Sequence, residues 1–170
     1  MSDEASDNAR REHFRFPCEQ TEYIKTVGKL LLTILCGIFT ELGFEVKPRS
    51  LEANGVDMEV LLASRLALVI EVLNWSIGSR LTDNRKDNII RNLCAFDCNR
   101  LLVHTIPLSN LHGLEENEID IIQLGYQVLP ETYYDFFLTK EQVERRRIDC
   151  DSTRRDIRAK ILEYVNSHFS

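Results

Sequence analysis

The sequence predicts an α/β fold of the α+β kind, in which helices flank a central mixed β-sheet. Two runs rich in branched residues, 54–62 and 66–75, are separated by a short break at 63–65, a pattern typical of paired strands. Three consecutive strand-like segments, followed by a helix and another strand, suggest a mixed sheet flanked by helices. Before both runs, apolar residues recur at helical spacing: Ile24, Val27, Leu31, Ile34, Ile38 and Leu42.

Composition and charge narrow the classes of function. A chain of 170 residues suits one domain, and a net charge of −6 argues against broad nucleic-acid affinity without excluding a local basic groove. Five dispersed cysteines favour reduced thiols in a cytoplasmic protein. The N-terminal stretch does not resemble a signal peptide, and the longest apolar run, 30–39, is too short to span a bilayer, so we expect no membrane association.

The first half of the chain is expected to begin with a flexible polar tail, residues 1–20. Thr21 is a candidate cap for a helix over 22–42, and Gly43 is placed to end it. Segment 44–47 alternates apolar and polar residues and meets a proline, as outer strands do. The two apolar runs follow as strands.

The second half is expected to hold helices over 82–96 and 115–124, strands over 101–106 and 126–129, and C-terminal helices over 139–147 and 152–168. Thr82 or Asp83 would cap the first of these helices, and Gly125 would end the next. The predicted order is αβββαβαβ plus C-terminal helices. Residues 21–130 would form the core, and residues 131–170 a helical extension of the same domain.

Two carboxylates stand out because they interrupt apolar strands. Asp57 follows Gly55 at the start of one run, and Glu71 lies inside the next. Buried acids are costly unless they are paired, bind a metal or lie near water at a strand end. Structural explanations remain open, since Asp57 could cap a turn and Glu71 could form an ion pair with Arg85 or Lys86.

These residues and the element order resemble the core of the PD-(D/E)XK superfamily, the restriction-endonuclease-like nucleases, and within it Mrr-type enzymes and archaeal junction resolvases. Gly55-Val56-Asp57 matches the family's glycine–hydrophobic–aspartate strand start. Val69-Ile70-Glu71-Val72-Leu73-Asn74-Trp75 matches the following strand, except that Leu73 occupies the lysine position. The resemblance covers about residues 22–130 and implies a restriction-endonuclease-like core.

The resemblance implies a divalent-metal-dependent endonuclease that hydrolyses phosphodiester bonds, with DNA a better candidate than RNA. Asp57, Glu71 and the backbone carbonyl of Val72 would hold Mg²⁺ or Mn²⁺, and Glu22 could add a third acid, as first-helix acids do in some relatives. Mg²⁺ prefers oxygen ligands and keeps several waters. Adjacent strands lie about 4.8 Å apart, so neighbouring positions can share one ion.

The absence of the family's lysine leads to two functional hypotheses. Leu73 cannot orient water or stabilise charge, so Arg85 or Lys86, at the start of the following helix, would supply the cation in an active enzyme. Lys25 is a weaker candidate for that role. Alternatively, the chain is a catalytically inactive module of the same fold that binds nucleic acid or protein. A homodimer is left open by either hypothesis.

Overall fold

A computed structural model describes residues 17–48, 55–76, 78–129 and 140–169, and the side chains of these residues outside 17–27 and 140–151. The predicted N-terminal tail falls mostly outside this part of the chain. Two compact units are present, one formed by residues 31–128 and the other by the described parts of 1–30 and 129–170. The predicted domain boundaries near residues 20 and 130 remain predictions.

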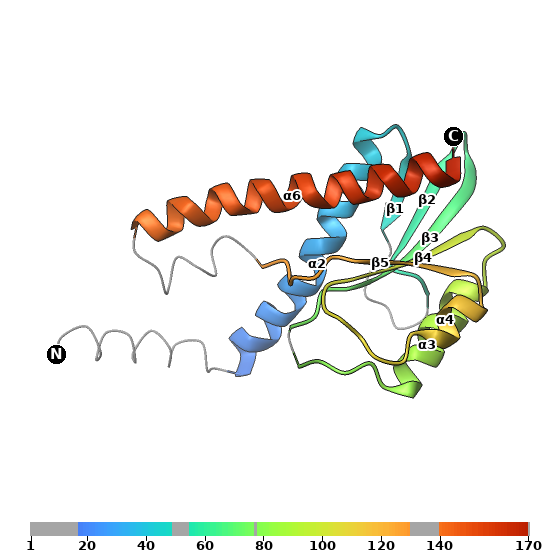
Figure 1. Ribbon diagram of the computed structural model, residues 1–170, viewed down its shortest axis with the longest axis horizontal. Coiled ribbons are helices and arrows are strands. Elements are labelled where there is room, and N and C mark those ends of the chain that lie inside the picture. The colour runs from blue at the N-terminus through green and yellow to red at the C-terminus, as the bar shows by residue number, and fades with distance from the viewer. Residues whose placement is uncertain (1–16, 49–54, 77, 130–139, 170) are drawn as a thin grey trace. The chain divides into compact units, whose positions relative to one another are not determined.

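The larger unit is an α+β structure built on one mixed sheet with strand order β1-β2-β3-β4-β5 (Figure 1). The strands are β1 (Glu45–Pro48), β2 (Met58–Leu62), β3 (Arg65–Leu73), β4 (Asn99–His104) and β5 (Ile119–Gln123). β1, β2 and β3 pair antiparallel, whereas β3, β4 and β5 pair parallel. The prediction that the two apolar runs form adjacent antiparallel strands is therefore confirmed.

A two-residue turn joins β2 to β3 at the predicted break. Ala63 and Ser64 have φ angles of 50° and 64°, so both adopt the left-handed conformation that tight hairpins require. The register pairs Met58 with Ile70 and shifts once, between Val60 and Leu61. This register decides which side chains of the two strands share a face.

The helices are α2 (Pro17–Glu41), α3 (Asp83–Cys94), α4 (His112–Glu116) and α6 (Lys140–Phe169). The prediction that the first helix starts at residue 22 is wrong, because proline is well tolerated in a first helical turn and the helix begins at Pro17. Its predicted end is confirmed: Gly43 has a φ of 95°, and the Phe44 N–H donates to the Phe39 carbonyl at 3.0 Å. The Phe39 and Phe44 rings pack edge to face, with centroids 5.7 Å apart, which closes a Schellman-type cap.

Helices cover both faces of the sheet within this unit (Figure 1). On one face, the Cys36 thiol of α2 donates to the Met58 sulfur at 3.3 Å. On the other, α3 packs against β3 and β4, and α4 packs against β5. Thr82 caps α3 as predicted, since its side chain accepts the Arg85 N–H at 3.2 Å.

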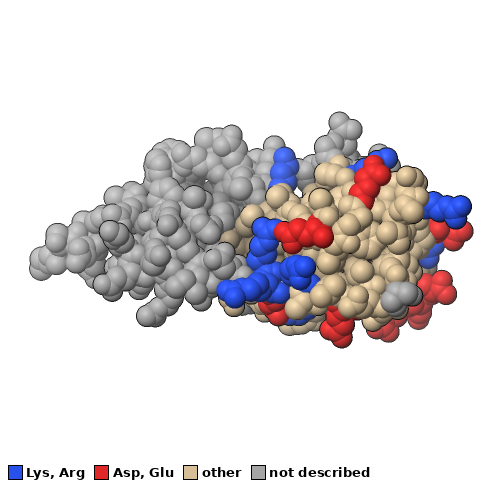
Figure 2. All heavy atoms as spheres, turned by 90° about the horizontal axis from the view of Figure 1, so that it is seen from above, with Lys and Arg blue, Asp and Glu red and all other residues tan. Residues whose placement is uncertain are grey.

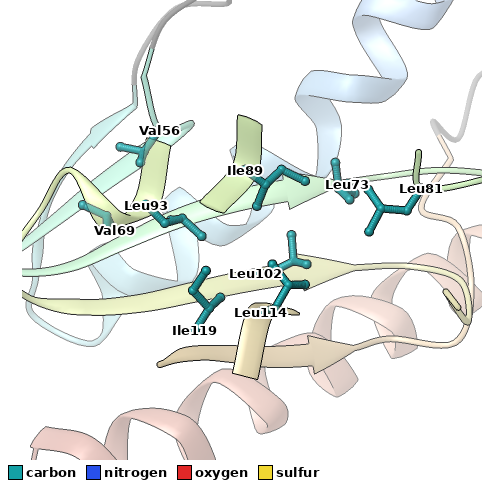
Figure 3. Packing of buried hydrophobic residues seen from close by; sticks show 9 residues of the cluster. All are labelled: Val56, Val69, Leu73, Leu81, Ile89, Leu93, Leu102, Leu114 and Ile119. Atoms are coloured by element: carbon teal, nitrogen blue, oxygen red, sulfur yellow. The ribbon is translucent and has the colours of Figure 1, made fainter. Parts of the chain in front are cut away.

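An apolar cluster fills the space between α3 and the sheet (Figure 3). Val69 and Leu73 of β3 both belong to it, and Leu73 is only 2% exposed. Because side chains two apart in a strand share a face, Glu71, which lies between them, also points toward α3. The cluster consists of Val56, Val69, Leu73, Leu81, Ile89, Leu93, Leu102, Leu114 and Ile119.

The predictions of a helix over 115–124 and a strand over 126–129 are wrong. Glu118 has a φ of 57°, which ends the short α4, and β5 occupies Ile119–Gln123. The edge of β4 needs a hydrogen-bonding partner, and the three isoleucines of β5 are β-branched residues that favour strands. Gly125, with a φ of 89°, therefore follows a strand and not a helix.

The C-terminal region forms one helix, α6, so the predicted break between residues 147 and 152 is wrong. Residues 148–151 contain neither glycine nor proline, the residues that most readily interrupt a helix. The C-terminal half of this helix contains an ion pair one helical turn apart, since Lys160 Nζ lies 2.6 Å from Asp156 Oδ2. Figure 2 shows basic and acidic side chains interspersed over the described part of the face it displays.

No described helix combines the length and the apolar character needed to cross a membrane.

Replacing Leu73 by lysine is expected to destabilise the fold, because an ammonium group would be buried among aliphatic side chains. The loss should match or exceed the roughly 2–5 kcal/mol that a buried leucine-to-alanine change costs. Leu62→Lys, at a leucine that is 41% exposed, should change the free energy of unfolding by less than about 0.5 kcal/mol. Urea unfolding measures both, and a Leu73→Lys protein as stable as wild type would contradict the packing.

Candidate active site

The structure brings the two predicted acids together. Continuing the β2–β3 register by one residue beyond Met58 and Ile70 places Asp57 directly opposite Glu71. Directly opposed residues on adjacent strands have neighbouring side chains on the same face. Asp57 and Glu71 therefore meet on the α3 face of the sheet.

Asp57 is fixed by the strand that carries Glu71. The backbone N–H of Val72 donates to Asp57 Oδ2 at 2.8 Å, so this oxygen binds the neighbouring strand. The Val72 carbonyl lies on the same side of β3 as its N–H, because both groups of a strand residue point toward the same neighbour. Consistent with this alternation, the Leu73 carbonyl points the other way and accepts the Thr105 N–H beyond β4 at 3.2 Å. The Val72 carbonyl therefore points toward the neighbouring chain segment that carries Asp57.

Glu71 is a buried carboxyl group whose charged form is disfavoured. It is 3% exposed, and burial is the main reason that its pKa rises from 4.5 to about 8. The negative charge of Asp57 and a carboxyl–carboxyl hydrogen bond with Asp57 raise the pKa further. A hydrogen bond from Asn92 and the charge of Arg85 lower it in part. These effects together favour the protonated form of Glu71 in the metal-free protein.

The two candidate cations have different surroundings. Arg85, in the first turn of α3, is exposed, and its positive charge lowers the pKa of Glu71. Lys86 is 8% exposed, and its Nζ donates to Asn110 Oδ1 at 2.9 Å. Asn110 in turn donates to Asp83 at 2.6 Å, so Lys86 ties α3 to the loop before α4. A catalytic role for either residue remains a prediction.

The predicted acid and cation of the first helix lie outside the described side chains. Glu22 and Lys25 belong to α2, and their side chains are among those that the structure does not describe. Another acid, Glu59, lies in β2 two residues after Asp57 and opposite Val69. Its charge raises the pKa of the Cys98 thiol, although burial has the larger effect on that group.

Three residues of the family-like motif have structural roles here. Leu73 packs in the apolar cluster beneath α3. The Asn74 side chain binds the backbone of Val128: it donates a hydrogen bond to the Val128 carbonyl at 2.7 Å and accepts one from the Val128 N–H at 3.0 Å. The Trp75 N–H donates to Thr105 Oγ1 at 2.8 Å. These contacts hold the chain after β5 across the ends of β3 and β4.

Sequence reasoning missed Asn92, whose Nδ2 donates to Glu71 Oε1 at 3.2 Å. A signal was present, because Asn92 lies two helical turns after Arg85 and therefore on the same side of α3. α3 thus supplies both of the groups that lower the pKa of Glu71.

The oxygen atoms at this site suit a hard divalent cation. Two carboxylates and a backbone carbonyl are ligands that Mg²⁺ and Mn²⁺ accept, with water or substrate completing the coordination. Within the described ranges, no group of three or more histidine, cysteine, aspartate or glutamate side chains could hold a metal. A metal site here would therefore depend on the carbonyl of Val72 as well as on the two acids.

Comparison with known proteins adds no family assignment: no protein-family model matches the chain, and no curated protein matches it either. The contacts around Asp57 and Glu71 are therefore the basis for assigning a function.

Glu71→Gln is expected to remove a pH-dependent loss of stability in the metal-free protein. The folded state holds the Glu71 proton more tightly than the unfolded chain, so the resulting stability is complete below pH 4.5 and is lost as the pH rises through about 8. The glutamine side chain of the variant does not titrate in this pH range. At the upper end of the range, the free energy of unfolding of the variant should therefore exceed that of wild type by on the order of a few kcal/mol. Urea unfolding across this pH window measures the difference.

Glu116→Gln, at an exposed glutamate of α4, is the matched control and should keep the wild-type pH profile. A Glu71→Gln profile parallel to that of wild type would show that Glu71 is not the buried titrating group.

Proposed function

We propose that this chain is a divalent-metal-dependent nuclease with a restriction-endonuclease-like core, which hydrolyses phosphodiester bonds in DNA. The observation that supports this proposal is the pairing of the half-buried Asp57 with the buried Glu71 across two adjacent strands. Two ionised carboxylates about 4 Å apart repel by roughly 4 kcal/mol at an effective dielectric of 20. A divalent cation would replace that repulsion by attraction, which explains why such a pair would be kept in an apolar setting.

Each residue at the site has a definite part in this proposal. Asp57, Glu71 and the Val72 carbonyl would hold Mg²⁺ or Mn²⁺, which when bound supplies Lewis-acid activation of the phosphate and of water. The Val72 N–H orients Asp57 for that task. Arg85 is the best-placed cation to stabilise negative charge on a phosphate, since it acts on Glu71 and its side chain is exposed.

A second candidate function, a catalytically inactive binding module, has one observation in its favour. The family's lysine position is filled by Leu73, which is part of the apolar cluster. A site without that lysine could retain the metal as a structural ion, or lose it, while the fold serves to bind nucleic acid or protein. A homodimer is compatible with either function.

Mn²⁺ is expected to bind and to stabilise the folded protein. Because the ion would bind only the folded state, the free energy of unfolding should rise by about 2.7 kcal/mol when the free ion is at 100 times its Kd. Asp57→Asn and Glu71→Gln should each remove most of this increase, whereas Glu116→Gln should keep it. Calorimetric titration with Mn²⁺ gives the affinities directly, and titrations in which wild type binds no better than Asp57→Asn would refute the metal site.

Arg85→Ala is expected to lower Mn²⁺-dependent cleavage by about 10²–10³-fold, which is typical when one preorganised electrostatic partner is removed. Arg91→Ala, at an exposed arginine of the same helix, should leave cleavage nearly unchanged. Lys86→Ala should act mainly on stability, because Lys86 binds Asn110. The assay compares plasmid, linear, single-stranded and branched DNA with RNA.

If cleavage survives Arg85→Ala but is lost in a folded Lys86→Ala protein, Lys86 and not Arg85 supplies the positive charge. If wild type binds Mn²⁺ but cleaves none of these substrates, the inactive binding module is the better account.

A further inference from the structure

We propose that Asn92 is a positioning residue of this metal site, which restricts Glu71 to binding the ion through a single carboxylate oxygen and so favours small ions over Ca²⁺. This inference rests on the proposed function, because it concerns the ion that Asp57 and Glu71 would share. It goes beyond that proposal by assigning a role to an amide on α3 and a selectivity to the site.

The hydrogen bond from Asn92 defines which part of Glu71 remains available. Asn92 Nδ2 donates to Glu71 Oε1 at 3.2 Å, and Glu71 is 3% exposed. With Oε1 engaged by the amide, Oε2 is the oxygen left for an ion shared with Asp57. An amide is suited to this task because its NH₂ group donates hydrogen bonds and adds no charge.

Asp57 is restrained in a corresponding way from the opposite side. Its Oδ2 accepts the Val72 N–H at 2.8 Å, so each carboxylate has one oxygen bound to a donor. The two donors come from different elements, since Val72 belongs to β3 and Asn92 to α3. Both acids are therefore held in place before any ion arrives, which reduces the ordering that ion binding would otherwise require.

The helix that carries Asn92 is itself well anchored. Ile89 and Leu93, on either side of Asn92 along α3, are fully buried in the apolar cluster. At the start of the helix, Lys86 binds Asn110, which in turn binds Asp83. The amide is thus presented to Glu71 by a rigid element.

Ion size makes this arrangement selective. Mg²⁺ and the similarly sized Mn²⁺ accept single carboxylate oxygens and waters in octahedral geometry, whereas Ca²⁺ takes six to eight ligands and often binds a carboxylate through both oxygens. Holding Glu71 Oε1 with an amide disfavours the two-oxygen mode. Loss of the amide should therefore change the preference between ions as well as the affinity.

The test is a calorimetric titration of the full chain with Mn²⁺ and with Ca²⁺, comparing wild type with Asn92→Leu, a substitution of similar size without a donor. We expect Mn²⁺ affinity to fall by about 10–100-fold, as when other groups that orient metal ligands are removed. Ca²⁺ affinity should fall less or increase, so the Mn²⁺/Ca²⁺ affinity ratio should drop. Asn92→Gln, which retains an amide donor, should restore much of the ratio.

Asn88→Leu is the matched control, because Asn88 lies one turn earlier on α3 and its side chain accepts a hydrogen bond from Arg91 at 3.1 Å. It should leave the ratio unchanged. Circular dichroism and the metal-free unfolding midpoint establish that each variant is folded, and Asn92→Ala replaces Asn92→Leu if the leucine is not tolerated.

Three outcomes would overturn the inference. Equal Mn²⁺ affinity of wild type and the folded Asn92 variants would refute the role of Asn92 while leaving the metal site intact. If the affinities for Mn²⁺ and Ca²⁺ fall by the same factor, with no recovery in Asn92→Gln, Asn92 contributes only to packing. Absence of Mn²⁺ binding by wild type would refute both this inference and the proposed function.

Discussion

The placement of the half-buried Asp57, just before β2, opposite the buried Glu71 of β3 is the constraint on which the site depends. Burial and the proximity of Asp57 raise the pKa of Glu71 to about 8, so the metal-free protein retains a proton where two charges would repel. The surrounding groups reduce this cost without removing it: the Val72 N–H binds Asp57, and Asn92 and Arg85 act on Glu71. A divalent ion is the partner that would neutralise the remaining charge.

The apolar cluster that borders the acids supports this arrangement and limits its chemistry. Leu73 lies on the same face as Glu71 and packs with Leu81 and Ile89, so its burial contributes stability that offsets the cost of burying Glu71 (Figure 3). A lysine at this position would have to bury its charge in the same cluster. Assigning the cation to Arg85, on the rim of the site, keeps the apolar packing and leaves a positive charge accessible to a phosphate.

Much of the architecture could be predicted from the sequence, because the strand pairing and the caps depend on local patterns. The break at 63–65 and the cap at Thr82 are short-range signals, and the opposition of Asp57 and Glu71 follows once the hairpin is assumed. The helix predicted over 115–124 was wrong because pairing with β4 outweighed the local pattern. The hydrogen-bond partners of Lys86 and Asn92 could not be predicted from the sequence, since they depend on the rotation of α3 over the sheet.

The central claim is that Asp57 and Glu71 hold one divalent ion. Anomalous diffraction from crystals soaked in Mn²⁺ would test this most directly, because it locates the ion without reference to activity. The account predicts a peak within coordination distance of both carboxylates and of the Val72 carbonyl. Ordered Asp57 and Glu71 side chains with no peak between them, in crystals that show Mn²⁺ elsewhere, would contradict it.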